Sequence, residues 1–381
     1  MATDRGYAYQ TDVVPAPGET IREVLAERSI SQKELASLLD KSEKFVSQLL
    51  GGKAPLRPQT AVDLERVLGV PASFWSNSEA LYQEWLARRN ETARLEEHSD
   101  WLRRFPIKEM TSHHWLARRD SVVDQMRELL SFFGVASPEG WRRYWSTLAN
   151  TAFRRSMAFE MDLGSLSAWL REGELRGADI DCRPYSAKAF RAALTSARGL
   201  TRESPTVFVP ELERLFAATG VAVVFVPELP RIRCSAATRW LGSDKALIQL
   251  CLRYRTDDHL WFSFFHEAGH VLSQSRSAVF LDCDGKSAEE QEADRFAADV
   301  LIPPRDYARL VLMQPLSVGD IEVLADEVGV SPGIVVGRLQ HDGHLPWRTN
   351  LNRLKRKLRW AAKSDAYSAA GRTPIPPQAE H

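Results

Sequence analysis

One stretch limits what this chain can fold into more than any other: residues 261–273 read WFSFFHEAGHVLS. Its centre, HEAGH at 266–270, is an HExxH pattern with apolar residues at helical spacing on both sides. Four residues are slightly more than one helical turn, so both imidazoles project from one face and can bind a single metal ion. Zinc suits neutral imidazole, and a coordination position left to water lowers the pKa of that water towards neutrality. The stretch therefore predicts a hydrolytic zinc site with His266 and His270 as ligands and Glu267 as general base.

A second predicted helix offers a third ligand. Residues 287–304 read SAEEQEADRFAADVLIPP, in which alanine, phenylalanine and valine form an apolar stripe that ends at two prolines. Glu292 lies at the inward edge of this stripe, and a buried carboxylate is costly unless it is paired, so a metal ion would suit it. Glu289, one turn earlier, is the second candidate. The alternatives are a solvated charge in an acidic first turn for Glu292, and ordinary core packing for the two histidines.

These residues resemble the ImmA/IrrE family of zinc metallopeptidases, whose pattern is HExxH followed by an E-A-N/D-x-F-A-x-x-L-L-x-P helix. The resemblance covers roughly residues 207–304, where HEAGH is followed by EADRFAADVLIP. It implies that His266, His270 and Glu292 bind Zn2+ and that Glu267 is the general base.

Composition sets outer bounds on the chain. Its 381 residues are too many for one ordinary core, and its fifty basic and fifty acidic residues cancel, so a nucleic-acid site must be a local patch. The longest apolar run, residues 221–226, is too short to span a membrane. The four cysteines lack CxxC spacing, which favours small buried residues in a reducing compartment: Cys182, Cys234, Cys251 and Cys283. We therefore expect a cytoplasmic protein with no membrane partner.

Residues 17–75 predict five short helices, with serines at positions 31 and 42 as N-caps of the second and third. This stretch resembles the Cro/repressor type of helix-turn-helix and, more narrowly, HigA-like antitoxins. The resemblance implies that the third helix enters the major groove of an operator-like DNA site. The residues then expected at the DNA are Gln32, Glu43, Lys44, Ser47, Gln48 and Lys53. The alternative is a helical module that contacts only proteins.

A small sheet is predicted directly before the HExxH helix. A continuous apolar run at 221–230 reads as a strand, residues 237–242 and 246–254 read as two more, and 242–244 reads as a hairpin turn between them. Arg239 and Arg253 lie on these strands and are possible substrate-binding residues, although structural salt bridges are the more common role of such arginines.

The predicted fold class is therefore mainly α with a small α+β zincin-like peptidase domain. A five-helix helix-turn-helix domain precedes it, and helical regions lie between the two and after the peptidase. The expected boundaries are 1–75, 76–204, 205–312, 313–363 and a disordered tail at 364–381. Within them, the tryptophans of the middle region are expected in a core rather than on a nucleic-acid surface, and residues 351–363 are expected to form a basic helix.

Two functions from different classes fit these features. One is a DNA-binding transcriptional regulator fused to a gluzincin-like zinc endopeptidase, which cleaves a partner repressor in a stress or mobile-element response. The other is a non-proteolytic antitoxin and autorepressor of the HigA-like type that keeps the zincin fold as a scaffold. Either protein is a possible homodimer.

Overall fold

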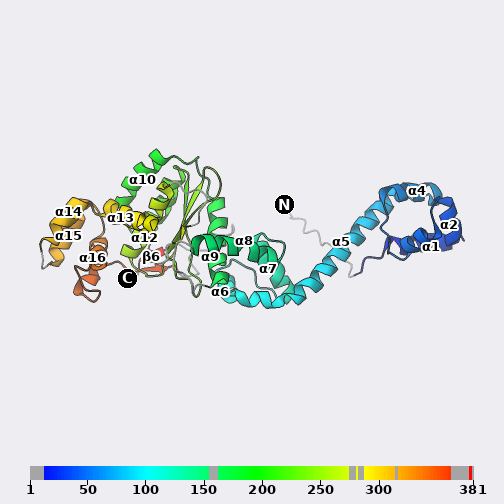
Figure 1. Cartoon of the computed structure of the whole chain (residues 1–381), viewed down its shortest axis with the longest axis horizontal. Coiled ribbons are helices and arrows are strands. Elements are labelled where there is room, and N and C mark those ends of the chain that lie inside the picture. Colours follow the sequence, from blue (N-terminus) through cyan, green and yellow to red (C-terminus); the bar gives the residue numbers. More distant parts are fainter. Residues whose placement is uncertain are drawn as a thin grey trace, which may run out of the picture. The chain divides into compact units, whose positions relative to one another are not determined.

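The structure is a computed structural model that describes residues 13–153, 162–273, 280–281, 287–313, 316–361 and 377–379. It divides into two compact units, residues 1–99 and residues 100–381. The described residues are mainly helical, with a four-stranded sheet and a short two-stranded sheet in the second unit, which confirms the predicted fold class (Figure 1). None of the described helices is long and apolar enough to cross a membrane.

The first unit is the predicted five-helix bundle. Ser31 and Ser42 begin the second and third helices, because each hydroxyl accepts a hydrogen bond from a backbone N–H three residues later. The core contains Ile21, Leu35 and Trp75, each fully buried. The helices are α1 (Pro17–Glu27), α2 (Gln32–Leu38), α3 (Glu43–Leu50), α4 (Pro58–Leu68) and α5 (Ala72–Glu97).

The second unit opens with a helical region whose core is aromatic. The ring of Trp101 lies 4.9 Å from Phe105 and 5.8 Å from Trp141, measured between centroids. Trp101, Trp115, Trp141, Trp145 and Trp169 are all buried, which confirms the interpretation of these residues as core. The elements are η1 (Ser99–Arg104), α6 (Ile107–Ser112), α7 (Val122–Phe133), α8 (Pro138–Phe153), α9 (Leu163–Asp179), α10 (Ala187–Leu200) and α11 (Pro205–Ala217).

The sheet follows with its strands in the order β1-β3-β2-β4, where β1 and β3 are parallel and β2 is antiparallel to both of its neighbours. All three predicted strands are present, and the predicted hairpin turn joins β2 to β3. Their bounds are β1 (Val221–Phe225), β2 (Ala236–Trp240), β3 (Ala246–Leu250) and β4 (Phe280–Leu281).

The two faces of the sheet carry different partners, because side chains alternate along a strand. Thr238 on β2 donates a hydrogen bond to the backbone carbonyl of Glu267 on α12 (Asp257–Leu272), 3.3 Å away. Gln249 on β3 points the other way and donates to the carbonyl of Trp169 on α9. Helix α12 therefore lies on one face of the sheet and α9 on the other.

The elements after α12 are α13 (Ala288–Leu301), α14 (Pro304–Val311), α15 (Val318–Val328), α16 (Pro332–His341), η2 (Asn350–Leu354), β5 (Leu358–Trp360) and β6 (Pro377–Ala379). Helix α16 packs into the core of the second unit through Ile334, Val335 and Val336. The basic helix predicted at 351–363 is wrong for residues 351–361, and residues 362–363 lie outside the described ranges. A short 3-10 helix and a strand stand there instead, because these residues have partners elsewhere in the chain.

Those partners are at the amino-terminal end of α12. The backbone N–H of Asp257 donates a hydrogen bond to the backbone carbonyl of Arg356, and the backbone N–H of Arg356 donates to the carboxylate of Asp257; both are 2.9 Å long. The Ser331 hydroxyl donates to the same carboxylate at 2.6 Å, and Lys355 Nζ lies 2.6 Å from the carboxylate of Asp258. The chain after α16 is thus held against the start of α12.

The last strand and one of the cysteines differ from what the sequence predicts. Residues 377–379 pair with β5, so the expected disorder of 364–381 is wrong for these three; the other residues of that tail lie outside the described ranges. Cys182 and Cys251 are not in disulfides, whereas Cys234 is disulfide-bonded, which contradicts the expectation for that cysteine. Cys283 lies outside the described residues.

Candidate functional site

The HExxH stretch forms the second half of α12, which is buried on nearly every side. Sheet residues, α13 and α16 surround this helix, and its core includes Trp261, Phe264 and Phe265. His266, Glu267 and His270 are each 3% exposed or less. Buried polar groups need partners, and the imidazoles find theirs on the next helix.

Three ligand atoms converge between α12 and α13. His266 Nε2 lies 3.0 Å from His270 Nε2 and 3.0 Å from Glu290 Oε2, and His270 Nε2 lies 3.4 Å from Glu290 Oε1. Ligand atoms about 2.0–2.1 Å from a tetrahedral zinc ion lie roughly 3.3 Å from one another. Two imidazoles and one carboxylate are also a donor set that zinc accepts. The residues present therefore fit a divalent metal ion.

The third member of this cluster is Glu290, so the prediction of Glu292 is wrong. Glu290 is 6% exposed and faces both histidines, whereas Glu292 is exposed, as is the second candidate, Glu289. Two residues correspond to about 200° of rotation around a helix, which takes Glu292 to the opposite side of α13 from Glu290. Only the side of α13 that faces α12 can supply a ligand to the cluster, and Glu290 lies on that side.

Hydrogen bonds keep Glu290 ionised. Burial by itself would raise the pKa of this carboxyl, but the hydrogen bonds from His266 and His270 outweigh burial and lower the pKa to about 2. A carboxylate rather than a carboxylic acid is the form that binds a metal ion.

Asp294, one turn after Glu290, orients the first histidine. Its Oδ1 lies 2.9 Å from Nδ1 of His266. A metal ion bound at Nε2 would displace the proton that this nitrogen shares with Glu290, and the contact with Asp294 would then hold the remaining proton on Nδ1. Glu290 and Asp294 were missed at the sequence level. Their four-residue spacing, the same as that of the two histidines, was the available signal.

Gly269, between the two histidines, permits the close approach of α12 and α13. A Cβ at this position would lie 3.2 Å from Cα of Ala293 and 3.3 Å from Phe296 Cδ1, which is tighter than ordinary contact. The small residues at 269 and 293 therefore let the carboxylate of α13 reach the imidazoles of α12.

The two arginines proposed for substrate binding have other surroundings. Arg239 forms a buried ion pair with Glu174 of α9, on the face of the sheet opposite to α12, so it does not reach the metal cluster. Its role is the structural salt bridge named as the alternative. The guanidinium of Arg253 lies 5.0 Å from the ring centroid of Tyr254, just after β3.

The residues expected at DNA form an exposed set in the first unit. All six are exposed, on α2, on α3 and just after it: Gln32, Glu43, Lys44, Ser47, Gln48 and Lys53. The buried face of α3, with Val46, Leu49 and Leu50, packs into the bundle instead. The amide and amine side chains are thus available for base edges and phosphates.

Comparison with known proteins matches two families. The Helix-turn-helix family matches residues 21–75, and the peptidase M78 family, described as the IrrE N-terminal-like domain, matches residues 250–340. The second match spans α12, α13 and α16, and so includes the whole metal cluster.

Two individual proteins are similar to the first unit. The chain is 38% identical over 63 residues to the uncharacterized HTH-type transcriptional regulator YddM of Escherichia coli (strain K12), covering 16% of this chain and 67% of that protein. The structure of an addiction module antidote protein of a HigA family from Coxiella burnetii is 25% identical, with a TM-score of 0.20, and covers 22% of this chain and 92% of that one.

Residues 21–75 therefore form a helix-turn-helix domain of a DNA-binding regulator, and residues 250–340 form a domain similar to the IrrE N-terminal-like peptidase family, in which His266, His270 and Glu290 fit a metal ion.

Proposed function

We propose that this regulator is a zinc-dependent endopeptidase whose substrate is another regulatory protein, most simply a repressor. The observation that carries the proposal is the convergence of His266, His270 and Glu290 within 4.8 Å of one another in the peptidase-family domain. A protein that kept the fold only as a scaffold would have no need of a buried carboxylate held ionised beside two histidines. The HigA-like antitoxin alternative leaves that feature unexplained.

His266, His270 and Glu290 would hold the metal ion, and Asp294 would fix the orientation of His266. When bound, zinc polarises a peptide carbonyl and lowers the pKa of water. Glu267 would take the proton from that water and deliver it to the leaving amine, which is the work of a general base and then a general acid. Its complete burial would keep bulk water away from this proton.

The DNA-binding half of the proposal assigns base contacts to Gln48, Ser47 and their neighbours on α3. Gln can pair bidentately with adenine, whereas Lys44 and Lys53 would bind phosphate. A regulator that binds operator DNA acts at the chromosome, so the proposal places the protein in the cytoplasm. The proposal also connects DNA binding to proteolysis, because cleavage of a partner repressor would relieve the repression of transcription.

The direct test is to incubate the zinc-loaded protein with repressors encoded beside its gene and to follow cleavage by mass spectrometry. We expect the wild type to cut one of them at a defined bond. The Glu267→Gln variant should bind zinc as the wild type does and lose turnover by at least about a hundredfold, since a general acid or base contributes roughly 10²–10⁴-fold. Retained cleavage by this variant would overturn the role of Glu267. If the wild type binds zinc yet cuts none of these proteins, the antitoxin alternative is favoured.

A further inference from the structure

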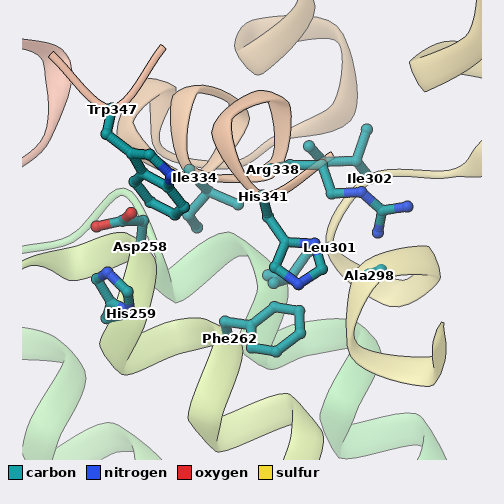
Figure 2. Close-up of a pocket in the computed structure, with 11 residues that line it drawn as sticks. Asp258, His259, Phe262, Ala298, Leu301, Ile302, Ile334, Arg338, His341 and Trp347 are labelled. Atoms are coloured by element: carbon teal, nitrogen blue, oxygen red, sulfur yellow. The ribbon is translucent and has the colours of Figure 1, made fainter. Parts of the chain in front are cut away.

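A pocket lies beside the metal cluster, between α12, α13 and α16 (Figure 2). Its cavity volume is about 90 Å³, below the range of about 300–1,000 Å³ typical of sites for whole ligands. Its floor is apolar and buried, formed by Ala298, Leu301, Ile302 and Ile334. The pocket therefore has room for one side chain rather than for a whole ligand.

The pocket continues the groove that holds the metal cluster. Phe262, on its wall, is one turn before His266 on α12, and the two ring centroids are 6.3 Å apart. On the other helix, Ala298 is one turn after Asp294, the residue that orients His266. A peptide placed at the cluster would therefore pass the mouth of the pocket.

The charged groups at the rim are already paired. Asp258 forms its ion pair with Lys355, and Arg338 lies 2.7 Å from a carboxylate oxygen of Asp342 while stacking over the ring of Tyr307. Two imidazoles also line the pocket, and each stacks on an aromatic ring: His259 on Tyr254 and His341 on Phe262. Because the carboxylate of Asp258 and the guanidinium of Arg338 are compensated within the protein, the pocket offers little to a charged ligand. Its chemistry selects an uncharged apolar group.

Trp347 at the mouth points to the same kind of ligand. In Figure 2 its indole lies over the pocket opposite Phe262, and the residue is 63% exposed. An indole left this exposed beside an apolar cavity gains free energy when an apolar group covers it.

We propose that this pocket receives a large apolar side chain of the peptide that is cleaved, such as leucine, methionine or phenylalanine, at a fixed position near the scissile bond. The inference rests on the proposed peptidase function and adds its sequence preference. The pocket begins one turn of helix, about 5.4 Å, from His266, and an extended peptide advances about 3.3 Å per residue. The selected residue therefore lies within about two positions of the bond that breaks.

The experiment begins with the zinc-loaded full-length protein and a library of proteome-derived peptides, whose cleavage sites are identified by mass spectrometry. Large apolar residues should be concentrated at one position within about two residues of the cut. Two synthetic peptides that differ only by Leu or Ala at that position then measure the preference. We expect kcat/KM to be at least about tenfold higher for the leucine peptide, the usual cost of an underfilled hydrophobic pocket.

Substitutions in the pocket separate specificity from general damage. Ala298→Phe fills the pocket, so it should reduce the Leu-over-Ala preference to below about twofold while leaving turnover of the alanine peptide nearly unchanged. Trp347→Ala, at the exposed mouth, should weaken the preference without a risk to the core. Ala308→Phe is the matched control, because Ala308 is an exposed helical alanine of α14 outside the pocket. It should keep the wild-type preference.

Binding provides a readout that does not depend on turnover. Calorimetry with the Glu267→Gln variant should show tighter binding of the leucine peptide than of the alanine peptide, and Ala298→Phe in that background should remove the difference. Two results would overturn the proposed role of the pocket without contradicting the peptidase function. One is cleavage without any positional preference, and the other is an equal loss of kcat/KM for both peptides in Ala298→Phe. No cleavage by the wild type together with leucine-selective binding would contradict the proposed function and support the pocket as a peptide site. Neither cleavage nor selective binding would overturn both.

Discussion

Glu290 and Glu292 are two residues apart on α13, yet only Glu290 lies with the histidines. The pair is therefore a matched test of the cluster. Glu290→Gln should lower zinc affinity by more than about 100-fold, beyond the 10- to 100-fold usual for loss of an outer hydrogen-bonding partner. Glu292→Gln should leave it within about twofold. Competition against a chromophoric chelator measures both, and equal losses in the two variants would refute the assignment of Glu290.

Glu290 and Glu292 also show how far individual site residues could be predicted from the sequence. The two histidines and Glu267 follow from local geometry, because a four-residue spacing brings side chains together on any helix. To predict the third ligand, one must know which side of α13 faces α12. An apolar stripe alone defines that side only to within a residue or two. The buried positions include Glu290 itself, a charged residue, which a pattern of apolar residues does not count. The family resemblance was aligned on the same stripe and led to the same error.

Asp257 predicts a dependence of stability on pH. Burial raises its pKa from 3.8 to about 6, although the hydrogen bond from Ser331 acts in the opposite direction. Between these pH values the folded protein holds a proton on Asp257 that the unfolded chain has released. The contribution of this protonated carboxyl to stability is therefore complete below pH 3.8 and is lost as the pH rises through about 6. The ionised form at pH 7 costs about 3 kcal/mol by linkage.

Asp257→Asn should remove this part of the pH dependence. Urea unfolding of the second unit, followed by circular dichroism, should show a smaller loss of stability between pH 4 and pH 7 than in the wild type. Asp299→Asn on α13 is the control, because Asp299 is exposed and should leave the wild-type profile unchanged. An unaltered profile in Asp257→Asn would show that this carboxyl does not titrate in the folded protein as described.

At the scale of elements, the contact between α12 and α13 holds the cluster together. Gly269→Val would force α13 away from α12, because even a Cβ there meets the backbone of Ala293 at 3.2 Å. We expect zinc affinity to fall by at least about tenfold, as for other changes that misplace ligands. Gly199→Val on α10 is the matched control, since a Cβ at that glycine would meet no atom within 4 Å beyond the backbone of its own helix. Isothermal titration of zinc into both variants makes the comparison, and equal affinities would contradict this role of Gly269.

Elements with local signals were predictable, whereas those determined by distant partners were not. Strand β1 is a continuous apolar run, β2 and β3 are mostly apolar, and a turn lies between these last two, so their sequence carries the information. Residues 351–363 have helical periodicity and basic charge, but Lys355 and Arg356 bind the start of α12 instead. Such tertiary contacts outweigh a helix propensity of a few tenths of a kcal/mol per residue.

For the whole molecule, the two units separate DNA binding from the metal cluster. Removal of zinc with a chelator should leave operator affinity within about twofold, because the helix-turn-helix has its own core. That affinity should fall steeply as salt rises, since each phosphate neutralised releases counterions. Fluorescence anisotropy with DNA from the upstream region of its own gene measures both effects.

A pair of lysines tests where the DNA lies. Lys44→Ala on α3 should weaken binding and reduce the salt slope by about one, the effect of one lost phosphate contact. Lys108→Ala, an exposed lysine of α6 in the second unit, should change neither. A salt-independent interaction would favour the protein-contact module over a DNA reader.

The presence of more than one compact unit was predictable from the length of the chain. The chain is too long for one core, and two matched regions stand in the two units. The boundaries within the second unit remain predictions. The boundary at 75/76 falls inside α5, since that helix runs without interruption from Ala72 to Glu97. Proline and serine near position 71 marked the start of this helix, and nothing in its sequence marked an early end.

The contacts between the start of α12 and the segment after α16 determine how short a working peptidase can be. A fragment that stopped at residue 340, where the family match ends, would lack Lys355 and Arg356. Asp258 would then have a buried charge with no counterion, and Asp257 would lose one of its backbone donors, each in the first turn of the helix that carries both histidines. Anyone preparing this domain for crystallisation or metal analysis should therefore place its carboxyl terminus beyond Ala361.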